Sequence, residues 1–193
     1  IFVASASGFT YIMNGITLTF NILYLIVGGI VGGYIGSKLT AMIKTKSLEK
    51  IFSVLLVIVS IRMFLNGNFE SSFNENPFFY IIIGIVTGIL SGLLGIGGGI
   101  VRIPLLIIFG GLENIVAQGF SLIATIPTAM TAAVTKLKGN PELIKQGTYI
   151  GLFGIIGSII GGNAAFLMSQ NVLNTVFAIF LLIVSFNLYL KKD

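Results

Sequence analysis

Apolar stretches separated by short polar segments run along the whole of this chain. Six of them have the length and hydropathy of membrane helices: residues 18–43, 48–65, 78–94, 115–134, 143–168 and 172–190. About 20 apolar residues cross a hydrocarbon core of about 30 Å. A further apolar stretch, residues 1–12, starts without a basic segment, a helix cap or a methionine, so we do not expect it to be a signal peptide. We interpret it as a helix cut through within a larger protein, and the alternative is a short or processed chain.

The chain repeats itself at an offset of 125 positions. Without a gap, 17 of 65 positions are identical between residues 1–65 and 126–190. The identical pairs include Gly29 with Gly154, Gly32 with Gly157, Gly36 with Gly161, Phe52 with Phe177 and Ser60 with Ser185. We therefore predict an all-α, polytopic transmembrane helix bundle of two homologous repeats. Residues 1–65 form the carboxyl-terminal part of the first repeat, residues 66–76 a polar connection, and residues 77–193 the second repeat.

Basic residues indicate which connections face the cytoplasm. Lysines gather in three places, with Lys44, Lys46 and Lys50 in one, Lys136, Lys138 and Lys145 in another, and Lys191 and Lys192 in the last. Short cytoplasmic segments are enriched in lysine and arginine, so we predict that these places are cytoplasmic. The equivalent connections near Lys46 and Asn171 then fall on opposite sides of the membrane, which makes the repeats inverted, as in many secondary transporters.

Composition narrows the chemistry that this chain can perform. Of its 193 residues, 55% are hydrophobic and 9% are charged, whereas a soluble domain has about 25% charged residues. Cysteine and histidine are both absent, which removes disulfides, thiolate chemistry and most zinc sites. The net charge of +5 comes from lysines between apolar stretches, not from one basic surface. We expect no cofactor, no metal, no catalytic residue and no nucleic-acid partner.

Glycines recur at every fourth position in three of the predicted helices. These ladders consist of Gly28, Gly32 and Gly36, of Gly84, Gly88 and Gly92, and of Gly157 and Gly161. A spacing of four places them on one face of a helix, where two backbones can approach closely. The pattern favours tight helix packing and does not by itself indicate a ligand.

Residues 95–110 do not fit an ordinary membrane span. The segment starts with Gly95, Gly97, Gly98 and Gly99, each of which destabilises a helix by about 1 kcal/mol relative to alanine. We therefore predict a glycine-rich helix break, which inside a membrane must be buried or line a wet cavity. Pro104 is expected in the first turn of the next helix. Crossing, re-entry and one broken helix are all compatible with this pattern.

A glycine break followed by a helix start exposes backbone amides and the positive end of a helix dipole, which suits an anion. Arg102 follows the break, and an ionisable group at membrane depth usually has a function. The predicted substrate-binding residues are Ser91, Gly95, Gly97, Gly98, Gly99, Arg102, Pro104 and Ser121. The alternatives are a purely structural kink at the glycines and an arginine that reaches the lipid headgroups.

The acidic residues are predicted to lie outside the spans. They are Glu49, Glu70, Glu75, Glu113, Glu142 and Asp193. Proton and sodium relays usually need carboxylates within the membrane, so coupling of that kind is not expected. A cationic site without buried anions fits an anionic substrate.

The glycine, serine and proline spacing from Gly84 to Pro104, followed by residues 117–122 and by Gly157 and Gly161, resembles the second repeat of the TauE/SafE family. The resemblance covers nearly the whole chain. It implies a permease of a bacterial or archaeal plasma membrane that moves sulfite, sulfoacetate or other small organosulfur anions without a nucleotide-hydrolysing domain. Phe120 stands before Ser121 where the family often has threonine, and the first glycine-rich motif of such a protein would precede Ile1.

Three functions compete at this point. A permease for small anions, working by a secondary or facilitated mechanism, explains both Arg102 and the glycine-rich segment. A membrane-embedded enzyme would have to take its base or metal ligands from serine, tyrosine and lysine alone. A packing or assembly subunit without its own transport site explains the ladders only. The expected partners are a small anion and the lipid bilayer, with a homo-oligomer as a further possibility.

Overall fold

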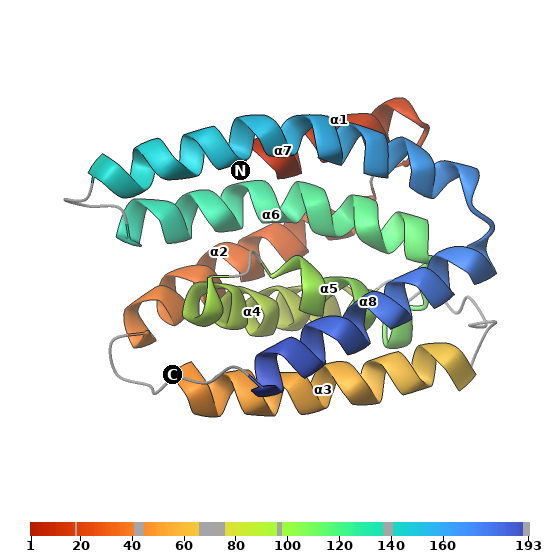
Figure 1. Ribbon diagram of the computed structural model, residues 1–193, viewed down its shortest axis with the longest axis horizontal. Coiled ribbons are helices and arrows are strands. Elements are labelled where there is room, and N and C mark those ends of the chain that lie inside the picture. The colour runs from red at the N-terminus through yellow and green to blue at the C-terminus, as the bar shows by residue number, and fades with distance from the viewer. Residues whose placement is uncertain (18, 41–44, 66–75, 96–97, 137–140, 191–193) are drawn as a thin grey trace.

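The computed structural model describes the chain except for residues 18, 41–44, 66–75, 96–97, 137–140 and 191–193. The described part is all-α, as predicted, and contains no strand. Its eight helices are α1 (Phe2–Met13), α2 (Asn21–Leu39), α3 (Thr45–Leu65), α4 (Pro77–Leu94), α5 (Gly99–Ile108), α6 (Asn114–Lys136), α7 (Pro141–Leu167) and α8 (Gln170–Leu190). Most of them lie nearly parallel or antiparallel to one another, as a bundle requires (Figure 1).

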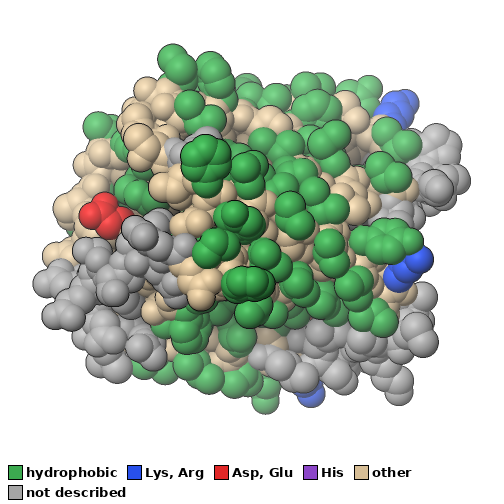
Figure 2. All heavy atoms as spheres, turned by 180° about the vertical axis from the view of Figure 1, so that it is seen from behind, with side chains coloured by type: hydrophobic (Ala, Val, Ile, Leu, Met, Phe, Trp, Pro, Cys, Tyr) green, Lys and Arg blue, Asp and Glu red, His purple; other side chains and the backbone are tan. Residues whose placement is uncertain are grey.

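The outer surface of the bundle is apolar, which identifies lipid as its surroundings. Three of the described helices are long and apolar enough to cross a membrane: α2, Ile144–Leu167 within α7, and α8. The other spans expected from the sequence correspond to α3, α4 and α6. Large apolar side chains point outward, among them Phe153 at 77% exposure. Figure 2 shows hydrophobic side chains over most of one face, with the visible basic side chains at its periphery.

Helices α2 and α4 touch backbone to backbone through their glycine ladders. A methyl group added at Gly32 would run into the carbonyl oxygen of Ile85. One added at Gly88 would lie 2.5 Å from the carbonyl oxygen of Gly29. Because lipid tails are as apolar as the helices, such close contact, with its dispersion energy, is what holds membrane helices together. Tight packing of these two ladders is confirmed.

The third ladder does not pack against the described part of the chain. Nothing lies within 4 Å of a methyl group added at Gly157 or Gly161. Helix α7 packs on α1 at other glycines, where a methyl group at Gly151 would lie 2.6 Å from the Phe2 ring and one at Gly154 2.5 Å from Val3. The packing prediction for Gly157 and Gly161 is therefore wrong for the described residues.

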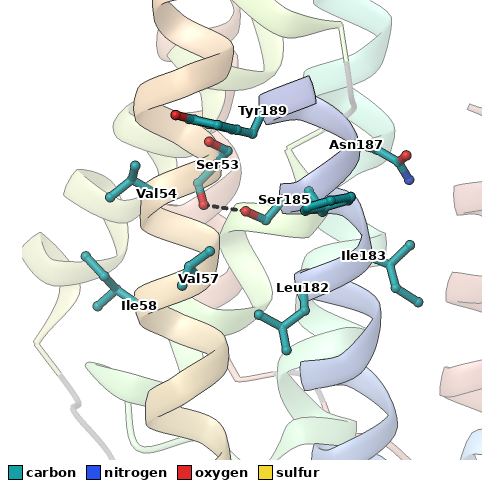
Figure 3. A pocket seen from close by; sticks show the side chains of 10 residues that line it. Ser53, Val54, Val57, Ile58, Leu182, Ile183, Ser185, Asn187 and Tyr189 are labelled. Carbon is teal, nitrogen blue, oxygen red and sulfur yellow. Dashed lines mark hydrogen bonds between the residues drawn. The ribbon is translucent and has the colours of Figure 1, made fainter. Parts of the chain in front are cut away.

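Helices α3 and α8 form an antiparallel pair in the core. The Ser60 hydroxyl donates to the carbonyl oxygen of Ala178 at 2.9 Å, and the Ser185 hydroxyl donates to that of Ser53 at 2.8 Å (Figure 3). Residue numbers rise along one helix as they fall along the other, which shows the antiparallel direction. An almost wholly apolar groove of about 670 Å³ follows this contact, and it does not include Arg102.

Replacing Gly32 by alanine should loosen the α2–α4 contact. The added methyl group forces two backbones apart, and such overpacking lowers the free energy of unfolding by about 1–3 kcal/mol. Gly147→Ala in α7 is the matched control, because nothing lies within 4 Å of a methyl group there and alanine favours a helix by about 1 kcal/mol. Thermal unfolding in detergent measures both variants, and equal midpoints would contradict the contact.

Candidate functional site

Arg102 lies inside the protein with 0% of its side chain exposed. It belongs to α5, whose 10 residues span about 15 Å, half the hydrocarbon thickness. Helix α5 folds back along α4, because a methyl group at Gly98 would lie 3.1 Å from both the Ser91 Cβ and the Thr87 carbonyl oxygen. The alternative in which Arg102 reaches the lipid headgroups is therefore wrong.

The guanidinium of Arg102 bonds only neutral oxygens within the described ranges. Its Nε donates to the Thr87 hydroxyl at 3.2 Å, and its Nη1 donates to the Ser121 carbonyl oxygen and the Thr125 hydroxyl, both at 3.2 Å. The Thr87 hydroxyl itself donates to the Ile83 carbonyl oxygen at 2.7 Å, and that of Thr125 donates to the Ser121 carbonyl oxygen at 2.7 Å. These oxygens orient the guanidinium but leave its charge uncompensated.

Two buried polar atoms at this site have no hydrogen-bond partner among the described residues: Nη2 of Arg102 and the hydroxyl oxygen of Ser121. Glycines lie beside both. A methyl group at Gly29 or Gly98 would lie 3.5 or 3.4 Å from Nη2, and one at Gly99 would lie 3.5 Å from the Ser121 hydroxyl. Buried polar groups are nearly always hydrogen-bonded, so both atoms are candidates for contact with a ligand.

The structure brings most of the predicted site residues together and separates others. Those around the guanidinium are Ser91, Gly98, Gly99, Arg102 and Ser121. Gly95 is exposed, so the expectation that it faces the interior is wrong. It ends α4 in a left-handed conformation with φ 73°, where the chain leaves the buried part of the helix. Gly97 lies outside the described residues.

Pro104 is not in the first turn of its helix, contrary to the prediction. It is buried inside α5, which begins at Gly99. Gly98 adopts a left-handed conformation with φ 73° and starts the helix before the proline is reached. Since successive residues turn by about 100° around a helix, Pro104 and Arg102 lie on different faces of α5. Pro104 is therefore a packing residue in this arrangement.

One acidic residue is also placed differently from the prediction. Glu49 lies within α3 and is buried at 9% exposure, although it was predicted to lie outside the spans. The 125-residue offset pairs it with Asn174, which is buried at 3% exposure and accepts a hydrogen bond from Asn114 at 2.7 Å. Helix α3 begins at Thr45, before the apolar stretch that starts at residue 48, so Glu49 is part of the helix.

Residues 80–193 match the model of the sulfite exporter TauE/SafE family. The match covers more than half of the chain and contains the whole of α5 and α6, and with them Arg102 and Ser121. The chain belongs to the TauE/SafE family. It is a multi-pass membrane protein of a transporter family.

Curated relatives of this TauE/SafE chain carry the name probable membrane transporter protein. YunE of Bacillus subtilis is 29% identical over 118 residues, which are 58% of this chain and 43% of that protein. A relative in Xylella fastidiosa is 28% identical over 177 residues, which are 85% of this chain and 66% of that protein. The chain thus spans from under half to about two thirds of the length of these relatives. No solved structure matches.

Several residues around Arg102 were missed by sequence reasoning in this TauE/SafE chain. They are Gly29, Thr87, Thr125 and Thr128. A signal exists, because Thr87 and Ser91 lie four positions apart on α4, as Ser121 and Thr125 do on α6. Spacing of four puts hydroxyls on one face of an apolar helix. Hydroxyls also bond their own helix backbone, so this pattern alone does not distinguish a site from ordinary packing.

Ser121→Ala should leave the stability of the anion-free protein unchanged or slightly higher. Its buried hydroxyl has no partner in the described structure, and an unsatisfied buried hydroxyl costs about 1–3 kcal/mol. Ser60→Ala is the matched control, because the Ser60 hydroxyl bonds the Ala178 carbonyl oxygen and its loss should lower stability by about 1 kcal/mol. Thermal unfolding in anion-free buffer compares them, and a larger loss for Ser121→Ala would contradict the site.

Proposed function

We propose that this chain forms part of a permease for small anions, with sulfite, sulfonates and other organosulfur compounds as the preferred class. Transport is secondary or facilitated. The observation that carries the proposal is the fully buried guanidinium of Arg102, which is held by neutral oxygens and whose Nη2 has no partner among the described residues. The family description, sulfite exporter, supports the sulfur-containing class.

The physical argument rests on the free energy of a buried charge. Removing an ion from water costs several kcal/mol even after the protein relaxes. In the described structure no carboxylate offsets that cost at Arg102, whose partners are hydroxyl and carbonyl oxygens. An arriving anion gains a charge-assisted hydrogen bond there and offsets part of the burial cost. The amino-terminal end of α5 adds a positive dipole on the same side as Gly98.

The glycine-rich segment fits a break that lines the substrate path. Helix α4 ends at Leu94 and α5 begins at Gly99, and both Gly95 and Gly98 have φ 73°. Left-handed backbone of this kind favours glycine because other residues clash there. Irregular backbone at membrane depth is tolerated where it is buried or borders water. Gly98, which is buried beside Nη2, is the residue through which this segment would meet the anion.

Inverted repeats, residues 1–65 and 77–193 joined by a polar connection, are part of the same proposal. The 125-residue offset pairs Ser60 with Ser185 and Ser53 with Ala178. The bond from Ser60 to Ala178 is therefore the equivalent of the bond from Ser185 to Ser53. The amino end of α3 lies at the left of Figure 1 and that of α8 at the right. Two equivalent helices that run in opposite directions are related by an axis perpendicular to both, which is the relation between inverted repeats.

The competing functions have less support. The relatives are named as membrane transporters, which does not favour an enzyme. A packing or assembly subunit gives no role to a buried cation. The free energy needed to remove that cation from water would then have no compensating interaction. The anion permease accounts for the buried charge and for the two buried polar atoms, Arg102 Nη2 and the Ser121 hydroxyl, that have no partner among the described residues.

Arg102→Gln should remove most anion transport by the full-length protein in liposomes. A hydrogen bond to a charged group is worth about 1.5–3 kcal/mol, so apparent anion affinity should fall by about 10- to 100-fold. Arg102→Lys should lose less, because it keeps the charge but not the planar donors. Flux of sulfite, sulfate, thiosulfate and methanesulfonate is the measurement, with membrane yield as the control. Normal affinity in Arg102→Gln would rule out the proposed role.

Single cysteines should reveal the inverted topology. The chain contains no cysteine, so Lys46→Cys and Asn171→Cys each introduce one thiol at equivalent positions. A membrane-impermeant thiol reagent should label them from opposite sides of sealed vesicles. Glu142→Cys is the control and should react from the same side as Lys46→Cys, since both lie at lysine-rich segments. Labelling of Lys46→Cys and Asn171→Cys from one side would contradict inversion.

A further inference from the structure

Two of the three nitrogens of the Arg102 guanidinium already donate hydrogen bonds within the protein. Nε donates to Thr87, and Nη1 donates to both Ser121 and Thr125. A bidentate complex with an oxyanion uses two nitrogens along one edge of the guanidinium. Nη2 takes part in two such edges, one with Nε and one with Nη1. In each edge the second nitrogen is occupied, so the two-point fork expected of an arginine is not available.

We propose that Thr87 and Thr125 are positioning residues that make Arg102 a one-point receptor. The anion is bound through a single acceptor atom, which accepts from Nη2. This inference rests on the proposed anion permease and adds the class of ligand that its site accepts. The site takes compact anions that offer one strong acceptor, so halides compete with sulfite or a sulfonate, and it does not select for a pair of oxygens.

The two threonines cannot easily release their nitrogens. The Thr87 side chain is fully buried at 0% exposure, and its proton is directed to the Ile83 carbonyl oxygen at 2.7 Å. The proton of Thr125 is likewise directed to the Ser121 carbonyl oxygen at 2.7 Å. With its proton engaged, each hydroxyl can only accept from the guanidinium. Both hydroxyls therefore fix the plane of the guanidinium as well as the choice of nitrogen.

The glycines around Nη2 limit the size of the ligand. A methyl group at Gly29 would lie 3.5 Å from Nη2 but 2.7 Å from the Thr128 hydroxyl. A methyl group at Gly98 would lie 3.4 Å from Nη2. The backbones of α2 and of the α5 start therefore approach the free amino group from two directions. A compact acceptor atom fits this arrangement better than a broad planar group does.

Removing one positioning hydroxyl should change selectivity rather than abolish binding. Thr87→Ala removes the hydroxyl that accepts from Nε and leaves its space open, so that Nε and Nη2 together can hold two oxygens. A second hydrogen bond of net value about 0.5–1.5 kcal/mol should raise the ratio of methanesulfonate affinity to chloride affinity by about two- to tenfold. Thr87→Ser restores the acceptor and should return the ratio to that of the unmodified protein.

The test uses the full-length protein in detergent and measures the dissociation constants of methanesulfonate and chloride by ligand-induced thermal stabilisation. Thr125→Ala is a second variant with the same expected direction, since it removes an acceptor of Nη1 and leaves its space open. A higher ratio in either variant, reversed in its serine counterpart, supports the one-point receptor. An unchanged or lower ratio in both variants, or loss of all binding in both, overturns it.

Arg102→Gln separates this inference from the proposed function. If that variant loses binding of both anions while the threonine variants keep the original ratio, the anion site stands and the one-point receptor is wrong. If Arg102→Gln binds both anions normally, the proposed function fails, and the inference that rests on it fails with it.

Discussion

The close approach of α2 to α4 is the contact on which the arrangement around Arg102 depends. It brings Gly29 of α2 and Thr87 of α4 to the same guanidinium, one beside Nη2 and the other bonded to Nε. Side chains in the ladders would hold the two helices apart and widen the space around the free amino group. In lipid there is no hydrophobic gain from helix association, so the dispersion energy of this backbone contact has to maintain the geometry.

Arg102 is hydrogen-bonded to neutral oxygens, and this fits the proposed anion site. A carboxylate at the same distance would neutralise the guanidinium and compete with any anion that approached it. Hydroxyl and carbonyl oxygens orient the side chain equally well, yet they leave its charge available to a ligand. A transporter must also release what it binds. The proposed one-point contact through Nη2 binds an anion less tightly than a two-point fork does, which suits an anion that must be released again.

Hydropathy predicted nearly all the helices, and ladder spacing predicted the α2–α4 contact, because both depend on patterns within single helices. Which helix packs against a given glycine ladder depends on the tertiary structure. The same spacing therefore led to a wrong prediction of tight packing at Gly157 and Gly161. Pro104 was misplaced because Gly98 can begin a helix on its own. Arg102 was identified from its charge in an apolar run. Thr87 and Thr125 were not, because hydroxyls in apolar helices commonly bond their own backbone.

The paired serine bonds between α3 and α8 bear on the energetics of a transport cycle. In a protein with inverted halves, the inward-open and outward-open forms arise when the halves exchange conformations. If the repeats are inverted as proposed, such an exchange turns the Ser60–Ala178 bond into the equivalent of the Ser185–Ser53 bond, and the reverse. This contact then has the same energy in both forms and favours neither. A small difference in how the two forms bind substrate is therefore enough to set the direction of the equilibrium.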